Sequence, residues 1–78
     1  MIFYSHQAEK FIEKAEQTLA QRLLDRIGRL EQEPFPQDCK SIKGESGMFR
    51  IRVGDLRIIY RCLGTLFILR IDKRETVY

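Results

Sequence analysis

Apolar residues follow a helical spacing in the first half of the chain. The positions that recur are Ala8, Phe11, Ile12, Ala15, Leu19, Leu23, Ile27 and Leu30. Ser5 can cap a first helix, and Thr18 and Gln21 have the spacing of a capping box. We therefore expect a helical hairpin with its turn near Gln17, ended by Pro34 and Pro36.

From Met48 onward the spacing changes to two, which is typical of strands. Gly54-Asp55 and Gly64-Thr65 mark turns between three such runs. Ile2-Phe3-Tyr4 reads as a short strand before the helices, and residues 35–47 read as a loop. The pattern predicts one α+β domain over residues 1–78. It consists of a short N-terminal strand, a helical hairpin and a three-stranded antiparallel meander, with the helices packed on one face of the sheet.

Alternation along the three strands sorts their side chains into two faces. The expected core face comprises Phe49, Ile51, Val53, Leu56, Ile58, Tyr60, Phe67, Leu69 and Ile71. The other face is rich in arginine: Arg50, Arg52, Arg57, Arg61, Arg70 and Arg74. If both turns are two-residue loops, Arg52 lies opposite Arg57 with Asp72 next across, and Arg50, Ile59 and Arg70 form the adjacent row. One aspartate cannot neutralise six guanidinium groups, whose planar forks suit phosphate oxygens.

Apolar residues also fall on the predicted arginine face. They are Met48, Ile59, Leu63, Leu66 and Ile68. An uncovered apolar patch of this kind usually marks a partner surface, although a curled sheet would hide part of it. We expect a partner protein to bind there.

Charge is unevenly distributed along the 78 residues. Residues 1–35 hold five basic and six acidic side chains, whereas residues 36–78 hold nine basic and five acidic ones. This asymmetry favours a polyanion as partner of the second half, the alternative being ordinary solvated charge. The sequence contains no apolar run long enough for a membrane span, no signal-peptide pattern and no metal-ligand spacing at Cys39 or Cys62. We expect a cytoplasmic domain without cofactor or metal.

Three segments together resemble the RelE/ParE toxin superfamily. They are Ser41-Ile42-Lys43-Gly44, the arginine-rich run from Phe49 to Tyr60, and Lys73-Arg74-Glu75-Thr76-Val77-Tyr78. The resemblance covers the whole chain in order and implies the toxin of a toxin–antitoxin pair. It also implies a partner, an acidic RelB-like antitoxin that holds the toxin silent in a heteromeric complex. RelE-type members cut messenger RNA in the ribosome without a metal, whereas ParE-type members inhibit DNA gyrase.

For RelE-type cleavage, the resemblance assigns catalytic roles to Arg50, Arg52, Arg57, Arg74 and Tyr78. Tyr78 would be the base, Arg74 the acid, and the other three would stabilise charge on the phosphate. We expect further contacts with RNA from Lys40, Lys43, Arg61, Arg70 and Lys73, although the two loop lysines could equally be solvated. Tyr60 matches the family motif, but its alternation predicts a core position. Two alternatives remain: a gyrase inhibitor without nuclease chemistry, and an inactive module that binds RNA or antitoxin.

Overall fold

The computed structural model of the chain describes residues 1–73. Its elements are β1 (Ile2–Tyr4), α1 (His6–Lys14), α2 (Gln17–Gln32), β2 (Lys40–Ser41), β3 (Met48–Val53), β4 (Leu56–Cys62) and β5 (Leu66–Lys73). The strands form one five-stranded sheet in the order β1-β5-β4-β3-β2. Neighbouring strands are antiparallel except β1, which pairs with β5 in parallel. The α+β class, the N-terminal strand, the two helices and the meander are confirmed.

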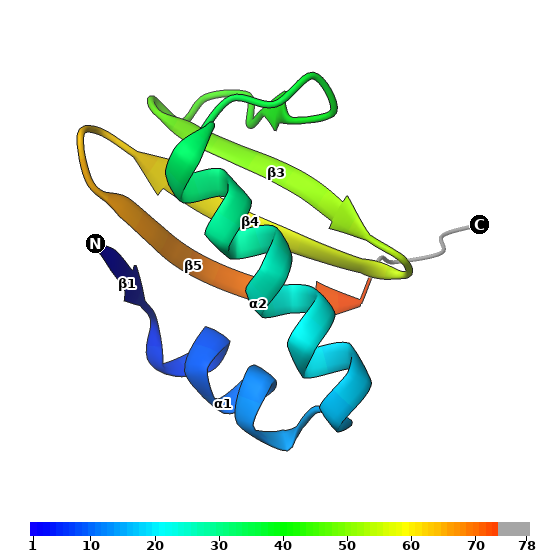
Figure 1. Ribbon diagram of the computed structural model, residues 1–78. Coiled ribbons are helices and arrows are strands. Elements are labelled where there is room, and N and C mark those ends of the chain that lie inside the picture. Colours follow the sequence, from blue (N-terminus) through cyan, green and yellow to red (C-terminus); the bar gives the residue numbers. More distant parts are fainter. Residues whose placement is uncertain (74–78) are drawn as a thin grey trace.

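Both helices lie on the same side of the sheet, as Figure 1 shows. α1 packs on β5, and α2 crosses toward β3. Leu23, Ile27 and Leu30 of α2 meet the buried side chains of β3, β4 and β5 in one core. The opposite side of the sheet bears no described element, and we call it the open face. None of the described helices is long and apolar enough to cross a bilayer.

The helical hairpin begins as predicted and turns slightly earlier. Ser5 Oγ accepts a hydrogen bond from the backbone N–H of Ala8 at 3.0 Å, which confirms the N-cap of α1. The chain leaves helical geometry at Ala15, and α2 starts at Gln17 with Glu16 as its N-cap. The predicted capping box at Thr18 is therefore wrong, and no side chain caps α2.

The loop expected at residues 35–47 contains the short strand β2. Lys40 pairs with Arg50, and Ser41 pairs with Phe49. Both residues of β2 are exposed, so neither helical nor alternating apolar spacing reveals the strand. β2 extends the sheet by one edge strand beside β3.

The turn between β3 and β4 fixes the register that the sequence predicts. Gly54 has φ +60°. The common two-residue hairpin turns require a positive φ at their first position, which glycine adopts readily. Val53 therefore pairs with Leu56, and Arg52 pairs with Arg57. On the other side, Arg57 pairs with Asp72, and Ile59 pairs with Arg70. Both predicted rows are confirmed.

β5 departs from regular alternation at Leu69, the residue that an irregularity in the β4–β5 ladder leaves without a partner. Ile59 pairs with Arg70, whereas Tyr60 already pairs with Ile68. The extra residue reverses the faces of the preceding part of β5. Leu66 and Ile68 are only 4% and 0% exposed and belong to the core, whereas Phe67 is 39% exposed. The prediction that Leu66 and Ile68 lie on the arginine face is wrong, as is the core position of Phe67.

Candidate functional site on the open face of the sheet

The strand pairing arranges the side chains of the open face in three parallel rows. We call them the aromatic row, the middle row and the charged row. They consist of Phe3, Phe67, Arg61 and Met48; of Arg70, Ile59, Arg50 and Lys40; and of Asp72, Arg57 and Arg52. Rows of this kind lie about 6.7 Å apart along the strands, because every second residue shares a face. Cations from three strands thus meet on one surface.

Arg50, Arg52 and Arg57 form the centre of this positive surface. Arg50 and Arg52 are exposed on β3, and Arg57 is half-buried directly opposite Arg52 on β4. Like charges in facing positions of a sheet destabilise it. Arg50 and Arg52 form no ion pair with an acid among residues 1–73. The three guanidinium groups can therefore receive an anion, and a phosphate offers the oxygens that they bind best.

Asp72 holds two arginines of the open face in place. Its carboxylate accepts a hydrogen bond from Arg57 Nε at 3.2 Å and another from Arg70 Nε at 2.8 Å. Partial burial of Asp72 opposes ionisation, but these hydrogen bonds outweigh it and hold the pKa of the carboxyl below its usual value. Asp72 is therefore ionised at neutral pH. It fixes Arg57 through Nε, which leaves the terminal nitrogens of that guanidinium for a ligand.

Arg61 links the aromatic row to the loop after β2. Its guanidinium lies 3.7 Å from the Glu45 carboxylate, and its Nε is buried without a hydrogen-bond partner among the described residues. This ion pair is partly exposed, and such pairs contribute little to stability. A phosphate arriving at the open face can compete with Glu45 for the guanidinium.

Tyr60 belongs to the core and takes no part in the open face. It is 0% exposed, its hydroxyl donates a hydrogen bond to the Pro34 carbonyl at 2.6 Å, and its ring stacks with that of Phe49. Burial, with a contribution from Cys39, raises the pKa of the hydroxyl far above its usual value. Tyr60 keeps its proton at neutral pH and cannot serve as a base, in agreement with the predicted core position.

The remaining residues that the sequence singled out are scattered. Lys40 extends the middle row, and Lys43 is exposed in the loop after β2. Lys73 pairs with buried Leu56 and so lies on the side of the helices, away from the other cations. Arg74 and Tyr78 lie outside the described residues. Of the predicted apolar patch, Met48 and Ile59 lie on the open face and Leu63 is 67% exposed in the β4–β5 turn.

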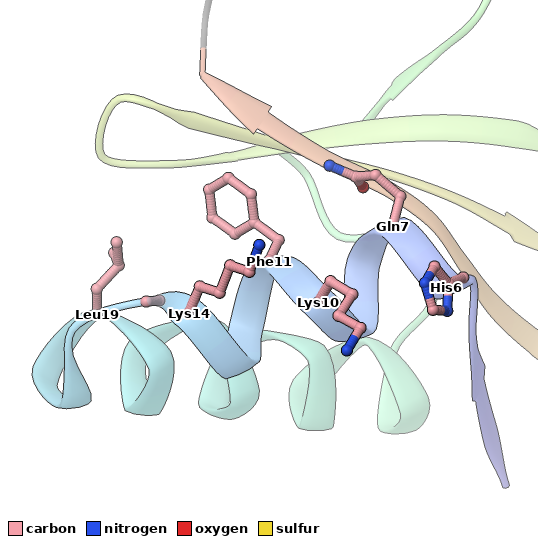
Figure 2. Close-up of a pocket in the computed structure, with 7 residues that line it drawn as sticks. His6, Gln7, Lys10, Phe11, Lys14 and Leu19 are labelled. Atoms are coloured by element: carbon pink, nitrogen blue, oxygen red, sulfur yellow. The ribbon is translucent and has the colours of Figure 1, made fainter.

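Sequence analysis missed two features, one on each side of the sheet. The first is the exposed aromatic pair Phe3 and Phe67, because the extra residue in β5 turns Phe67 to the open face, where Phe3 pairs with it. The second is an open groove of about 710 Å³ along α1. Its lining is His6, Gln7, Lys10, Phe11, Lys14, Ala15 and Leu19. Figure 2 shows Phe11 pointing into this groove and Gln7 reaching toward β5.

A family model described as the ParE toxin of the type II toxin–antitoxin system, parDE, matches residues 2–78. A comparison with curated proteins found no match to this chain. Among solved structures, the fold is similar to that of the archaeal RelE–RelB complex from Pyrococcus horikoshii. The TM-score is 0.84 and the identity 25%, over 97% of this chain and 96% of the other.

Two further solved structures have the same fold. The toxin–antitoxin complex RelBE2 from Mycobacterium tuberculosis matches with a TM-score of 0.78 and 26% identity, over 95% of this chain and 96% of the other. The isolated RelE toxin from E. coli matches with a TM-score of 0.84 and 16% identity, over 99% of this chain and 86% of the other. Two of these three similar proteins were thus crystallised together with an antitoxin.

Proposed function

Because the chain belongs to the ParE toxin family of type II toxin–antitoxin systems, a branch of the RelE/ParE superfamily, we propose that this toxin is a ribosome-dependent endoribonuclease. Its substrate is messenger RNA in the decoding site, and cleavage stops translation and growth. The observation that carries the proposal is the cluster of Arg50, Arg52 and Arg57 on the open face. The three arginines share that face on neighbouring strands, and Arg50 and Arg52 lack a carboxylate partner among residues 1–73.

The proposed reaction is an attack of a ribose 2′-oxygen on the adjacent phosphodiester. A base removes the proton of the 2′-hydroxyl, the new P–O bond forms, and the bond to the 5′-oxygen breaks. An acid gives a proton to that leaving oxygen. The products are a 2′,3′-cyclic phosphate and a free 5′-hydroxyl, so the reaction consumes no water. Negative charge accumulates on the phosphorane oxygens, where preorganised cations stabilise it most.

Each arginine of the cluster has a distinct part in this proposal. Arg57, oriented by Asp72, binds one phosphoryl oxygen from a fixed position. Arg50 and Arg52 are exposed and close on the phosphate from the neighbouring strand. The family resemblance adds Arg74 as acid and Tyr78 as base. A free tyrosine has a pKa of about 10, so nearby cations must lower that value before Tyr78 accepts a proton.

The proposed partner in the silent state is an acidic antitoxin. Homologous RelE toxins have been crystallised with RelB antitoxins. Acidic side chains of the antitoxin would pair with Arg50 and Arg52, and apolar ones would cover Met48, Ile59 and Leu63. The burial of Leu66 and Ile68 removes those two residues from the proposed contact.

Inhibition of DNA gyrase is the second candidate function, and the ParE description of the matching family favours it. A gyrase inhibitor needs a protein-binding surface and has no use for a phosphate site with an acid and a base. The arginine cluster therefore favours the nuclease.

The two candidates are separated by giving the purified toxin three substrates: naked messenger RNA, the same RNA on programmed ribosomes, and supercoiled DNA with gyrase. The proposal predicts cleavage on the ribosome alone, with 5′-hydroxyl ends, because the ribosome supplies the in-line geometry of the 2′-oxygen. Equal cleavage of naked RNA would refute the ribosome dependence. Gyrase-linked DNA breaks without RNA cleavage would establish the alternative.

A further inference from the structure

Two aromatic side chains lie side by side on the open face, next to the cations. Phe3 of β1 and Phe67 of β5 are paired in the parallel ladder, and their rings stack with centroids 5.3 Å apart and planes inclined by 21°. They are 46% and 39% exposed. The helices cover the other side of the sheet (Figure 1), so these rings do not contribute to the core.

Cations surround this pair on the side that faces the arginine cluster. Arg61 is the direct neighbour of Phe67 in the aromatic row, and Arg70 follows Phe67 along β5 into the middle row. The aromatic row is two rows from Arg57 and Arg52, a distance of about 13 Å along the strands. If a phosphate binds at the arginine cluster, a base one or two nucleotides away along the strand can therefore reach the stacked rings.

We propose that Phe3 and Phe67 form a platform on which a base of single-stranded RNA stacks, beside the phosphate held by Arg50, Arg52 and Arg57. This inference rests on the proposed function, since it extends the same RNA site by one subsite. Arg61 and Arg70 contact the connecting backbone. Every base has a flat π-face, so the platform contributes affinity without strict sequence preference.

Charge complementarity selects single-stranded RNA over an apolar protein segment as occupant. An apolar segment laid on the two rings would run beside Arg50, which forms no ion pair with an acid among residues 1–73. It would offer no further acceptor to Arg61 and Arg70, whose ion pairs with Glu45 and Asp72 are partly exposed. RNA offers a base to the rings and phosphates to the arginines at the same time. Single strands are also the form whose bases are free to splay onto aromatic side chains, whereas a duplex keeps its bases stacked inside.

The test measures binding of a five-nucleotide 2′-O-methyl RNA, which lacks the attacking hydroxyl, by fluorescence anisotropy at low salt. A second strand carries an abasic site in place of one base, and each position is tried in turn. Three variants are compared with the wild type: Phe67→Leu removes the aromatic ring, Phe67→Trp keeps an aromatic face, and Phe35→Leu removes an exposed aromatic ring that packs on Phe49 instead. Circular dichroism confirms that each variant is folded.

The proposal predicts that Phe67→Leu weakens binding of the intact strand about tenfold, whereas Phe67→Trp and Phe35→Leu bind within twofold of the wild type. At one position of the strand, the abasic site should weaken binding by the wild type about as much as Phe67→Leu weakens binding of the intact strand. The same abasic site should not weaken binding by Phe67→Leu any further. If Phe67→Leu weakens binding of every abasic strand by the same factor as it weakens binding of the intact strand, the platform is overturned. An RNA affinity of Phe67→Leu equal to that of the wild type would also overturn it.

Ribosomal cleavage is measured in parallel, which separates the two proposals. If cleavage by Phe67→Leu depends on toxin concentration in the same way as cleavage by the wild type, the platform is overturned and the nuclease stands. Tight, base-dependent RNA binding without any cleavage on the ribosome would overturn the nuclease and leave the platform standing. No RNA binding by the wild type would overturn the platform.

Discussion

The two faces of the sheet come from the same strands, yet they are built for different purposes. The centre of the helix-covered face is lined by apolar side chains, and the hydroxyl of buried Tyr60 donates a hydrogen bond to the Pro34 carbonyl. The open face sets like charges opposite each other at Arg52 and Arg57 and relieves them with a single carboxylate, Asp72. Facing like charges weaken the sheet on this face alone, which supports our proposal that the open face binds a ligand.

The largest expected effect on stability comes from placing a charged residue on the helix-covered face near the irregularity in β5. Ile68→Asp places a carboxylate at a fully buried position without a partner. The cost is several kcal/mol and comparable with the whole stability of a small domain. We expect Ile68→Asp to be unfolded by circular dichroism. Leu63→Asp, only a few residues away but exposed in the turn, should fold normally. A folded Ile68→Asp would mean that β5 alternates without interruption.

A smaller contrast is expected between two adjacent isoleucines of β4. Ile58 is buried against the helices, and Ile59 points to the open face. Ile58→Ala should lower the free energy of unfolding by about 3 kcal/mol, because a cavity is left in the core. Ile59→Ala should lower it by less than about 1 kcal/mol. Urea denaturation of both variants measures the contrast, and equal losses would show that the open face is covered in solution.

Tyr60→Phe probes the polar contact of the covered face. The substitution removes the hydrogen bond to Pro34 and leaves that carbonyl without its donor. We expect a loss of about 1–2 kcal/mol in the free energy of unfolding. Because Tyr60 keeps its proton at neutral pH, ribosomal cleavage by the folded variant should not change. A loss of cleavage with stability intact would instead give Tyr60 a part in the chemistry.

Asp72→Asn is the corresponding change on the open face, with the smallest expected effect on stability. The pKa of Asp72 is lowered in the folded protein, so its contribution is present above pH 4 and is lost as the pH falls through the lowered value. At pH 7 the variant should be less stable by about 0.5–1 kcal/mol, since the ion pairs are partly exposed. Urea denaturation should show this difference shrinking at pH 3. A difference that is constant with pH would contradict the assigned pairing.

Sequence alone predicted the architecture and the register as far as the pattern was unambiguous. Arg50, Arg52 and Arg57 alternate with apolar neighbours, and Gly54 fixes the turn between them, so their common face followed directly. The run Leu66-Phe67-Ile68-Leu69 is apolar on both faces. Alternation cannot determine which of these residues points inward, and so neither the extra residue in β5 nor the exposure of Phe67 was predicted. β2 was missed because Lys40 and Ser41 are both exposed.

The most direct test of the arginine cluster is single-turnover cleavage of messenger RNA on programmed ribosomes by Arg52→Ala. A matched control is Arg29→Ala, which removes an exposed arginine from α2 on the other side of the sheet. Loss of one cation beside the transition state should slow cleavage about a hundredfold. Arg29→Ala should cleave at nearly the wild-type rate, and both variants should be nearly as stable as the wild type. Cleavage by folded Arg52→Ala at the wild-type rate would contradict the assignment of the open face as the catalytic surface.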